Sequence, residues 1–258
     1  MSSQRIVYLL GDSITQGLGS KKVNFTDELS CLLGEGCKVV NLACTGTTID
    51  YALKLLKGEG LLNERGLDET LCIVIYGNVD AQIRPNREGK IFPHLPKRYK
   101  GGGMLMPRPF YSHSLKKSAV QHVDNAIRGL LARLIKLVDG QEQWVHIGAF
   151  AAQYAGLVDG LLDSGIDPVL CSCVYIDERL FPKSPRQYEL YNERIRTIAH
   201  DRRLPYVDIY ASLGGRVLLD GWDAVYNKDH FHPNGEGYRL MAEEIAGTIG
   251  CGERVCLR

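Results

Sequence analysis

The sequence predicts an α/β fold, an open α/β/α sandwich in which helices cover both faces of a parallel sheet. Two observations support this. Short runs rich in β-branched residues alternate along the chain with segments of helical periodicity, and that alternation is typical of α/β proteins with right-handed crossovers. Most of these runs are apolar at every position rather than at every second one, as expected of parallel strands covered on both sides.

About five runs are expected to form the sheet, since each is bounded by glycine or polar residues. The last of them is the weakest. The runs are RIVYLLG (5–11), KVVNLA (38–43), LCIVIYG (71–77), DPVLCSCVYI (167–176) and LPYVDIY (204–210).

The segments between these runs carry apolar residues at helical spacing. The last one opens with Pro-Asn and closes with Gly, an ordinary start and stop for a helix. The predicted helices span 23–34, 48–57, 118–138, 148–165, 188–201 and 233–250.

Residues 81–113 do not fit this alternation. They are rich in proline, contain GGG and carry seven Lys or Arg against one Glu. A connection this long within a compact domain is usually functional or disordered. We therefore expect a single domain, residues 1–258, with a basic Pro/Gly-rich insertion at about 81–113. The insertion is either a solvated excursion or a lid that attracts an anionic group.

Composition narrows the class of protein further. The chain has 258 residues, a net charge of +1 and 45% hydrophobic residues, which are ordinary values for a globular protein. No run is long enough for a signal peptide or a membrane span. We expect a cytoplasmic protein with reduced cysteines and with no nucleic-acid or membrane partner. Its oligomeric state is left open.

Polar residues follow the predicted strands at the edge where α/β sheets bind ligands. Asp12 and Ser13 follow the first run, Gly46 follows the second, and Asn78 and Asp80 follow the third. A KDHFHPNG stretch precedes the last helix. Ser13 can be an ordinary helix cap or a nucleophile, and the stretch before the last helix bears on that choice.

A serine hydroxyl becomes a useful nucleophile when a base takes its proton, and the base needs a partner that fixes its tautomer. Asp229 and His232 are three residues apart, so the carboxylate can reach the imidazole across one turn. The oxyanion of an acyl-transfer intermediate also needs donors. The N–H groups of Ser13 and Gly46 and a side-chain amide after the third strand are available.

These blocks resemble the GDSL/SGNH hydrolase superfamily: GDSIT, a glycine after the second strand, G-N-V-D after the third, and D-x-x-H-P before the last helix. The resemblance spans nearly the whole chain and implies a flavodoxin-like sheet. It implies Ser13 as nucleophile, His232 as base oriented by Asp229, and an oxyanion hole formed by Ser13, Gly46 and an Asn.

The third block departs from the family pattern G-x-N-D, because Val79 stands where the family has Asn. We expect Asn78 to substitute as the third oxyanion donor. The alternative is a hole that has lost one donor, which typically costs about 10²–10³ in rate.

Other polar residues were considered for the site. Asp12 is interpreted first as a turn residue, and Asp12, Asp80, Arg84 and Arg87 are candidates for contacts with the substrate. His230 and His232 have a metal-ligand spacing, but without a third ligand we interpret His230 as a neighbour of the triad. No metal or organic cofactor is expected.

The predicted function is a serine esterase that cleaves a short-chain ester, acetyl above all, from a polar and possibly anionic carbohydrate-type substrate. The basic insertion and the lack of an extended apolar lid segment favour this substrate. The same triad also fits an O-acyltransferase. The Val79 departure leaves a third reading, a degenerate domain that only binds carbohydrate.

Overall fold

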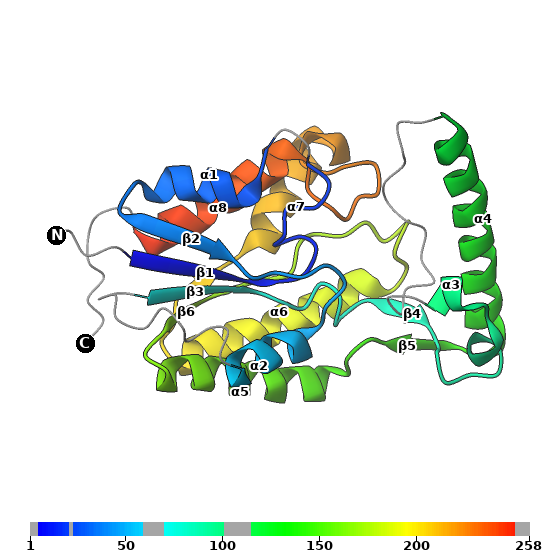
Figure 1. Ribbon diagram of the computed structural model, residues 1–258, viewed down its shortest axis with the longest axis horizontal. Helices are drawn as coiled ribbons and strands as arrows, with labels where there is room; N and C mark the ends of the chain where they lie inside the picture. The colour runs from blue at the N-terminus through cyan, green and yellow to red at the C-terminus, as the bar shows by residue number, and fades with distance from the viewer. Residues whose placement is uncertain (1–4, 21–22, 59–69, 101–114, 251–258) are drawn as a thin grey trace. The chain divides into compact units, whose positions relative to one another are not determined.

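The computed structural model describes residues 5–20, 23–58, 70–100 and 115–250. The chain divides into two compact units (Figure 1). Unit 1 comprises Met1–Ala81 and Val145–Arg258, and unit 2 comprises Gln82–Trp144.

Unit 1 is built on a five-stranded sheet with the order β2-β1-β3-β6-β7, in which all neighbours are parallel. This confirms the predicted fold class. The strands are β1 (Arg5–Gly11), β2 (Cys37–Asn41), β3 (Thr70–Ile75), β6 (Asp167–Cys171) and β7 (Tyr206–Val207).

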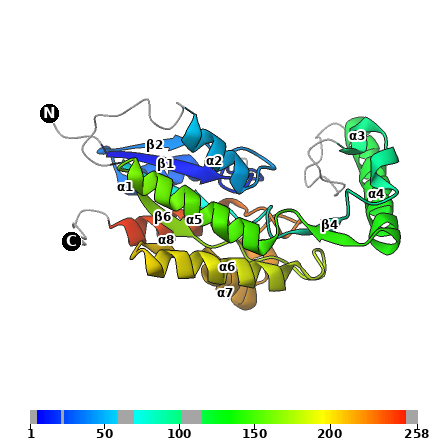
Figure 2. The same ribbon diagram turned by 90° about the horizontal axis from the view of Figure 1, so that it is seen from below.

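Helices cover both faces of the sheet (Figures 1 and 2). On one face α1 and α7 pack against α8, and on the other α5 packs between α2 and α6. The helices are α1 (Phe25–Leu33), α2 (Ile49–Lys57), α5 (Ile147–Asp163), α6 (Ser184–Asp201), α7 (Ile209–Asp220) and α8 (Gly235–Ile249), with a short 3₁₀ turn, η3 (Trp222–Ala224).

The apolar runs become strands because both of their faces are covered. Ile6, Val7, Leu9 and Leu10 of β1 have no exposed surface, and each such side chain stabilises the fold by roughly 1.5–3 kcal/mol. β1 lies between β2 and β3, so its carboxyl end is held on both sides. That end carries Asp12 and Ser13.

Two details differ from the predicted elements. The run 204–210 contributes only the two residues of β7, and α7 begins at Ile209. This helix was not predicted because Gly214 and Gly215 interrupt its sequence. Gly214 faces the Tyr175 ring, where a Cβ would lie 3.0 Å from a ring carbon, so its missing side chain allows close packing rather than a turn.

Unit 2 contains the predicted helix 118–138 and the described part of the basic insertion. The helix is α4 (Leu115–Val138), and β4 (Ile83–Pro85) pairs with β5 (Gln141–Gln143) in an antiparallel ribbon. The remaining elements are η1 (Phe92–His94) and α3 (Lys97–Lys100). A small core of Phe92, Tyr99 and Ile135 holds α4 against the chain before it. The predicted helix therefore belongs to unit 2 and packs on the core of that unit.

Residues 101–113 of the predicted insertion lie outside the described residues. Two of the eight cysteines, Cys251 and Cys256, also lie outside them. The six cysteines that are described are free thiols. Across the described ranges, no helix is long and apolar enough to cross a membrane.

Candidate active site

Ser13 lies in a tight turn that follows β1. Asp12 Oδ1 accepts a hydrogen bond from the Ile14 N–H at 2.9 Å, and the Ser13 carbonyl accepts one from the Leu18 N–H at 3.0 Å. Gly11 precedes this turn, and a Cβ there would lie 1.9 Å from Thr15 Oγ1. A residue with a side chain would therefore displace the turn that presents Ser13.

His232 comes from the loop before α8 and meets Ser13 from 219 residues away in the sequence. Its Nε2 lies 3.0 Å from Ser13 Oγ, and its Nδ1 lies 2.6 Å from Asp229 Oδ2. Asp229 Oδ1 accepts hydrogen bonds from the backbone N–H groups of Phe231 and His232. The carboxylate is thus fixed by its own turn while it orients the imidazole.

Both reacting side chains are nearly shielded from water, because Ser13 and His232 are each 5% exposed. A low-dielectric setting strengthens the interaction between the Asp229 carboxylate and an imidazolium. The arrangement can accept a proton from Ser13 and stabilise the cation that results.

The loop after β2 lies against the end of β1. The Cys44 N–H donates to the Gly11 carbonyl at 3.1 Å, and Gly46 has φ +73°, a conformation that favours glycine. No described residue accepts a hydrogen bond from the backbone N–H of Ser13 or of Gly46. Both N–H groups are therefore candidates for oxyanion donors.

Asn78 is fully buried, and its Oδ1 accepts a hydrogen bond from the Val174 N–H at 2.9 Å. The Asn78 amide group and the Val79 N–H lie toward Asp12, and both lower the pKa of its carboxyl. Asn78 Nδ2 and Asp12 Oδ2 nevertheless have no hydrogen-bond partner among the described residues. Burial is the larger influence and raises the pKa of Asp12 to about 6. The Asn78 side chain is therefore placed beside Asp12, and its Nδ2 is a buried donor without a hydrogen-bond partner in the part of the chain that the structure describes.

Asp12 and Asp80 have no exposed surface. Asp80 Oδ1 accepts a hydrogen bond from the Ile49 N–H at 3.0 Å, at the start of α2, and burial raises the pKa of Asp80 to about 7. Both carboxyls bond to backbone groups around the site. In this structure the two carboxyls stabilise the backbone after β1 and at the start of α2, and neither has surface exposed to a substrate.

Arg84 and Arg87 belong to unit 2, where both pair with Glu142. Arg84 is 2% exposed, its Nε lies 3.0 Å from Glu142 Oε1, and its guanidinium stacks 3.7 Å from the Trp144 ring centroid. Arg87 Nε also lies 3.0 Å from Glu142 Oε1. The ribbon of β4 and β5 brings these groups together within unit 2.

Sequence reasoning missed a second Asp–His pair. His230 Nδ1 lies 2.7 Å from Asp177 Oδ2, and its ring stacks on Trp222 with a centroid distance of 4.7 Å. Arg179 binds the same carboxylate through Nε and Nη2. Asp177 follows the fourth predicted strand, so extending the search of strand ends to that run would have found it.

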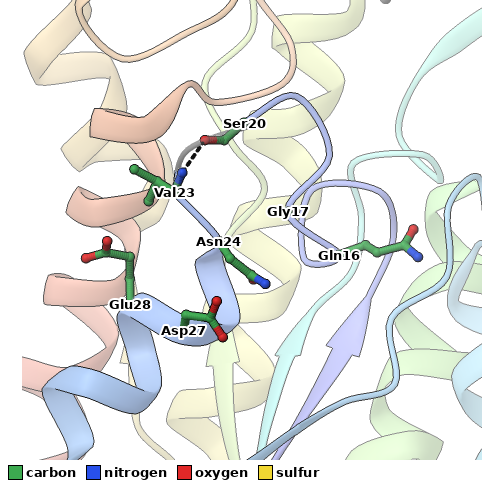
Figure 3. A pocket seen from close by; sticks show the side chains of 7 residues that line it. All are labelled: Gln16, Gly17, Ser20, Val23, Asn24, Asp27 and Glu28. Carbon is green, nitrogen blue, oxygen red and sulfur yellow. Dashed lines mark hydrogen bonds between the residues drawn. The ribbon is translucent and has the colours of Figure 1, made fainter.

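A polar hollow of about 420 Å³ lies beside the turn that begins at Ser13 (Figure 3). Ser20 accepts a hydrogen bond from the Val23 N–H at its rim. Gln16 bonds to Thr45, the neighbour of Gly46. The lining residues are Gln16, Gly17, Ser20, Val23, Asn24, Asp27 and Glu28.

The described part of the chain holds no group of three His, Cys, Asp or Glu side chains suited to a metal ion. The histidine pair of the sequence is divided between two carboxylates, His232 on Asp229 and His230 on Asp177.

Comparison with solved structures places this fold among known esterases. The acetylxylan esterase Axe2 of Geobacillus stearothermophilus is similar over 100% of both chains, with a TM-score of 0.62 and 16% identity. A lipase/acylhydrolase of Enterococcus faecalis is similar over 95% of both chains, with a TM-score of 0.60 and 18% identity. At these identities the likeness establishes the fold.

The family itself is established by sequence. A search of curated proteins finds no match, but the family model described as GDSL-like lipase/acylhydrolase matches residues 9–240. The match takes in the turn of Ser13, the loop of Gly46 and the Asp229–His232 stretch. The chain therefore belongs to the GDSL-like lipase/acylhydrolase family and is a hydrolase of ester bonds.

Proposed function

We propose that this chain is a serine esterase that removes an acetyl group from a carbohydrate-type substrate. The observation that carries the proposal is the continuous chain of contacts from Ser13 Oγ through His232 to Asp229, at 3.0 Å and 2.6 Å. Such a series of contacts lets a neutral imidazole take the proton of a hydroxyl as that hydroxyl attacks a carbonyl.

In the proposed mechanism, Ser13 Oγ bonds to the ester carbonyl carbon and its proton passes to His232 Nε2. The N–H groups of Ser13 and Gly46 stabilise the tetrahedral oxyanion. The intermediate collapses, the C–O bond to the alcohol breaks, and His232 returns the proton to the leaving oxygen. A water molecule then attacks the acyl-enzyme by the reverse route, releasing acetate and restoring Ser13.

The polarity of the surroundings supports a short acyl group on a hydroxyl-rich carrier. The hollow beside the turn is lined by amide, hydroxyl and carboxylate groups, which can hydrogen-bond to sugar hydroxyls but offer little apolar surface to a long acyl chain. Asp27 and Glu28 also make it unsuited to an anionic group. The acetylxylan esterase of the same fold has a matching substrate. A cytoplasmic location and the lack of nucleic-acid and membrane partners remain predictions from the sequence.

A fluorophosphonate probe tests the nucleophile, because it reacts covalently with an activated serine. We expect labelling of the native chain and of Ser30→Ala, a control in α1, and none of Ser13→Ala or His232→Ala. Labelling that persists in Ser13→Ala would refute the mechanism. The absence of labelling in the native chain would favour the binding-only reading.

Substrate preference is tested with p-nitrophenyl acetate, p-nitrophenyl octanoate and an acetylated xylo-oligosaccharide. We expect acetate esters to be hydrolysed faster than octanoate, and the oligosaccharide to release acetate. A preference for octanoate would overturn the acyl-group assignment. Acetyl transfer to an added sugar in place of acetate release would change the reaction class to acyltransfer.

A further inference from the structure

Helix α4 of unit 2 has an apolar stripe on its exposed side. Each side chain of the stripe is between 37% and 85% exposed. The stripe residues are Val120, Val123, Ile127, Leu130, Leu134 and Leu137.

Their spacing is 3, 4, 3, 4 and 3 residues, which is the a/d repeat of a coiled coil over nearly three heptads. Val120, Ile127 and Leu134 occupy a positions, and Val123, Leu130 and Leu137 occupy d positions. Two of the three a positions are β-branched and two of the three d positions are leucine. β-branched residues at a with leucine at d favour a two-stranded coiled coil. The stripe runs about 26 Å along the helix at 1.5 Å per residue.

The opposite side of α4 is already occupied within unit 2. Arg128, 3% exposed, donates from Nη2 to the Arg98 carbonyl at 3.0 Å and pairs with Asp124 at 2.7 Å. Ile135 packs on Phe92 and Tyr99. This helix therefore buries Asn125 and Arg128 while it exposes valine, isoleucine and leucine. A helix in a monomer normally has the reverse polarity.

We propose that the α4 stripe is a dimer interface and that its occupant is the same stripe on a second copy of this chain. A two-fold axis brings the same patch of both copies together, and an a/d seam is complementary to itself.

The area involved is sufficient. Covering the six side chains removes about 500–600 Å² from each copy, so the pair reaches the ~1,000 Å² that a specific interface needs. A hollow of about 330 Å³ lined by Val120, Val123 and Ile127 adjoins the seam, and it provides space for side chains of the facing helix. The proposal stands independently of the esterase assignment.

Sedimentation equilibrium of the full chain between about 1 and 100 μM tests the proposal. We expect a dimer for the native chain. Ile127→Asp and, separately, Leu137→Asp place a carboxylate from each copy in the seam, and we expect each to raise the dimer dissociation constant at least about 100-fold. Gly129→Asp, at a c position of the same helix where a Cβ would meet nothing within 4 Å, places the same charge away from the seam and should leave dimerisation within a few-fold of the native value.

Circular dichroism and acetate-ester hydrolysis of the same samples separate assembly from folding. Monomeric Asp variants with the native far-ultraviolet spectrum support the interface. A native chain that is monomeric at 100 μM would overturn it, and so would stripe variants that dimerise as the native chain does. A monomeric native chain whose stripe variants unfold more easily would assign the stripe to a contact within one chain.

Discussion

The loop before α8 carries two histidines in different settings. His232 contacts Asp229, three residues away, and extends to Ser13. His230 contacts Asp177, which comes from the segment after β6, and stacks on Trp222 with the ring planes 8° apart. The Nδ1-to-carboxylate distances are 2.6 Å and 2.7 Å, so the two Asp–His pairs are nearly identical when viewed alone.

The two Asp–His pairs differ in the further groups that each one contacts. One pair ends on a buried hydroxyl, and the other ends on an aromatic ring and on Arg179, whose side chain is 72% exposed. An imidazole on a carboxylate can act as the base for a proton donor that faces its other nitrogen, as Ser13 Oγ faces His232 Nε2. His230 has φ +48°, which is uncommon for a residue with a side chain, and in that conformation its ring contacts Asp177 and Trp222.

The largest expected difference between the pairs is in catalysis. Asp229→Asn should lower kcat by about 10⁴-fold, because a carboxamide no longer selects the tautomer with a proton on Nδ1 or stabilises the imidazolium. Steady-state hydrolysis of p-nitrophenyl acetate measures this. Asp177→Asn makes the same chemical change in the other pair and is the matched control. Equal losses in the two variants would contradict the assignment of roles.

A smaller effect is expected from Asp177→Asn itself. Asp177 is 4% exposed and binds His230 and Arg179, so its neutralisation should reduce the free energy of unfolding by about 1–3 kcal/mol. We expect kcat to change by less than about tenfold, since the substituted group does not touch Ser13 or His232. Urea titration and initial rates on one preparation give both numbers. A loss of activity without a loss of stability would place Asp177 in the catalytic machinery.

These two pairs also show what the sequence could predict. Asp229 and His232 are close in sequence, so their contact follows from a single turn. The pairing of His232 with Ser13 was implied by the family resemblance, since the two residues are 219 positions apart and His232 lies between η3 and α8 rather than after a strand. Asp177 and His230 are 53 residues apart, and no local motif links them. Only the fold brings them together.

The secondary structure also divides into elements that local sequence predicted and elements that only the fold explains. The strands β1, β3 and β6 were predicted because their apolar runs reflect burial on both faces, whereas β2, at the edge of the sheet, is only partly buried. Helix α7 was not predicted, since Gly214 is explained only by the Tyr175 ring against it. The periodicity of α4 predicted a helix but not its unit, because an exposed apolar stripe and a buried one have the same spacing.

The pH dependence of stability gives the smallest and most specific comparison. Bonding to Arg179, with a further contribution from His230, lowers the pKa of Asp177 from 3.8 to about 2. A carboxyl with a lowered pKa binds fewer protons in the folded state than in the unfolded state, so folding gains stability as pH rises through this range.

The stability difference between the native chain and Asp177→Asn should therefore be complete above about pH 5 and shrink as pH falls below 4. Urea titrations at pH 3, 4, 5 and 6 measure the difference at each pH. Arg179→Gln is a useful companion variant, because it removes the larger cause of the lowered pKa and should reduce the pH dependence more than His230→Gln. A difference that stays constant from pH 6 to pH 3 would mean that Asp177 stabilises the fold through packing rather than through its charge.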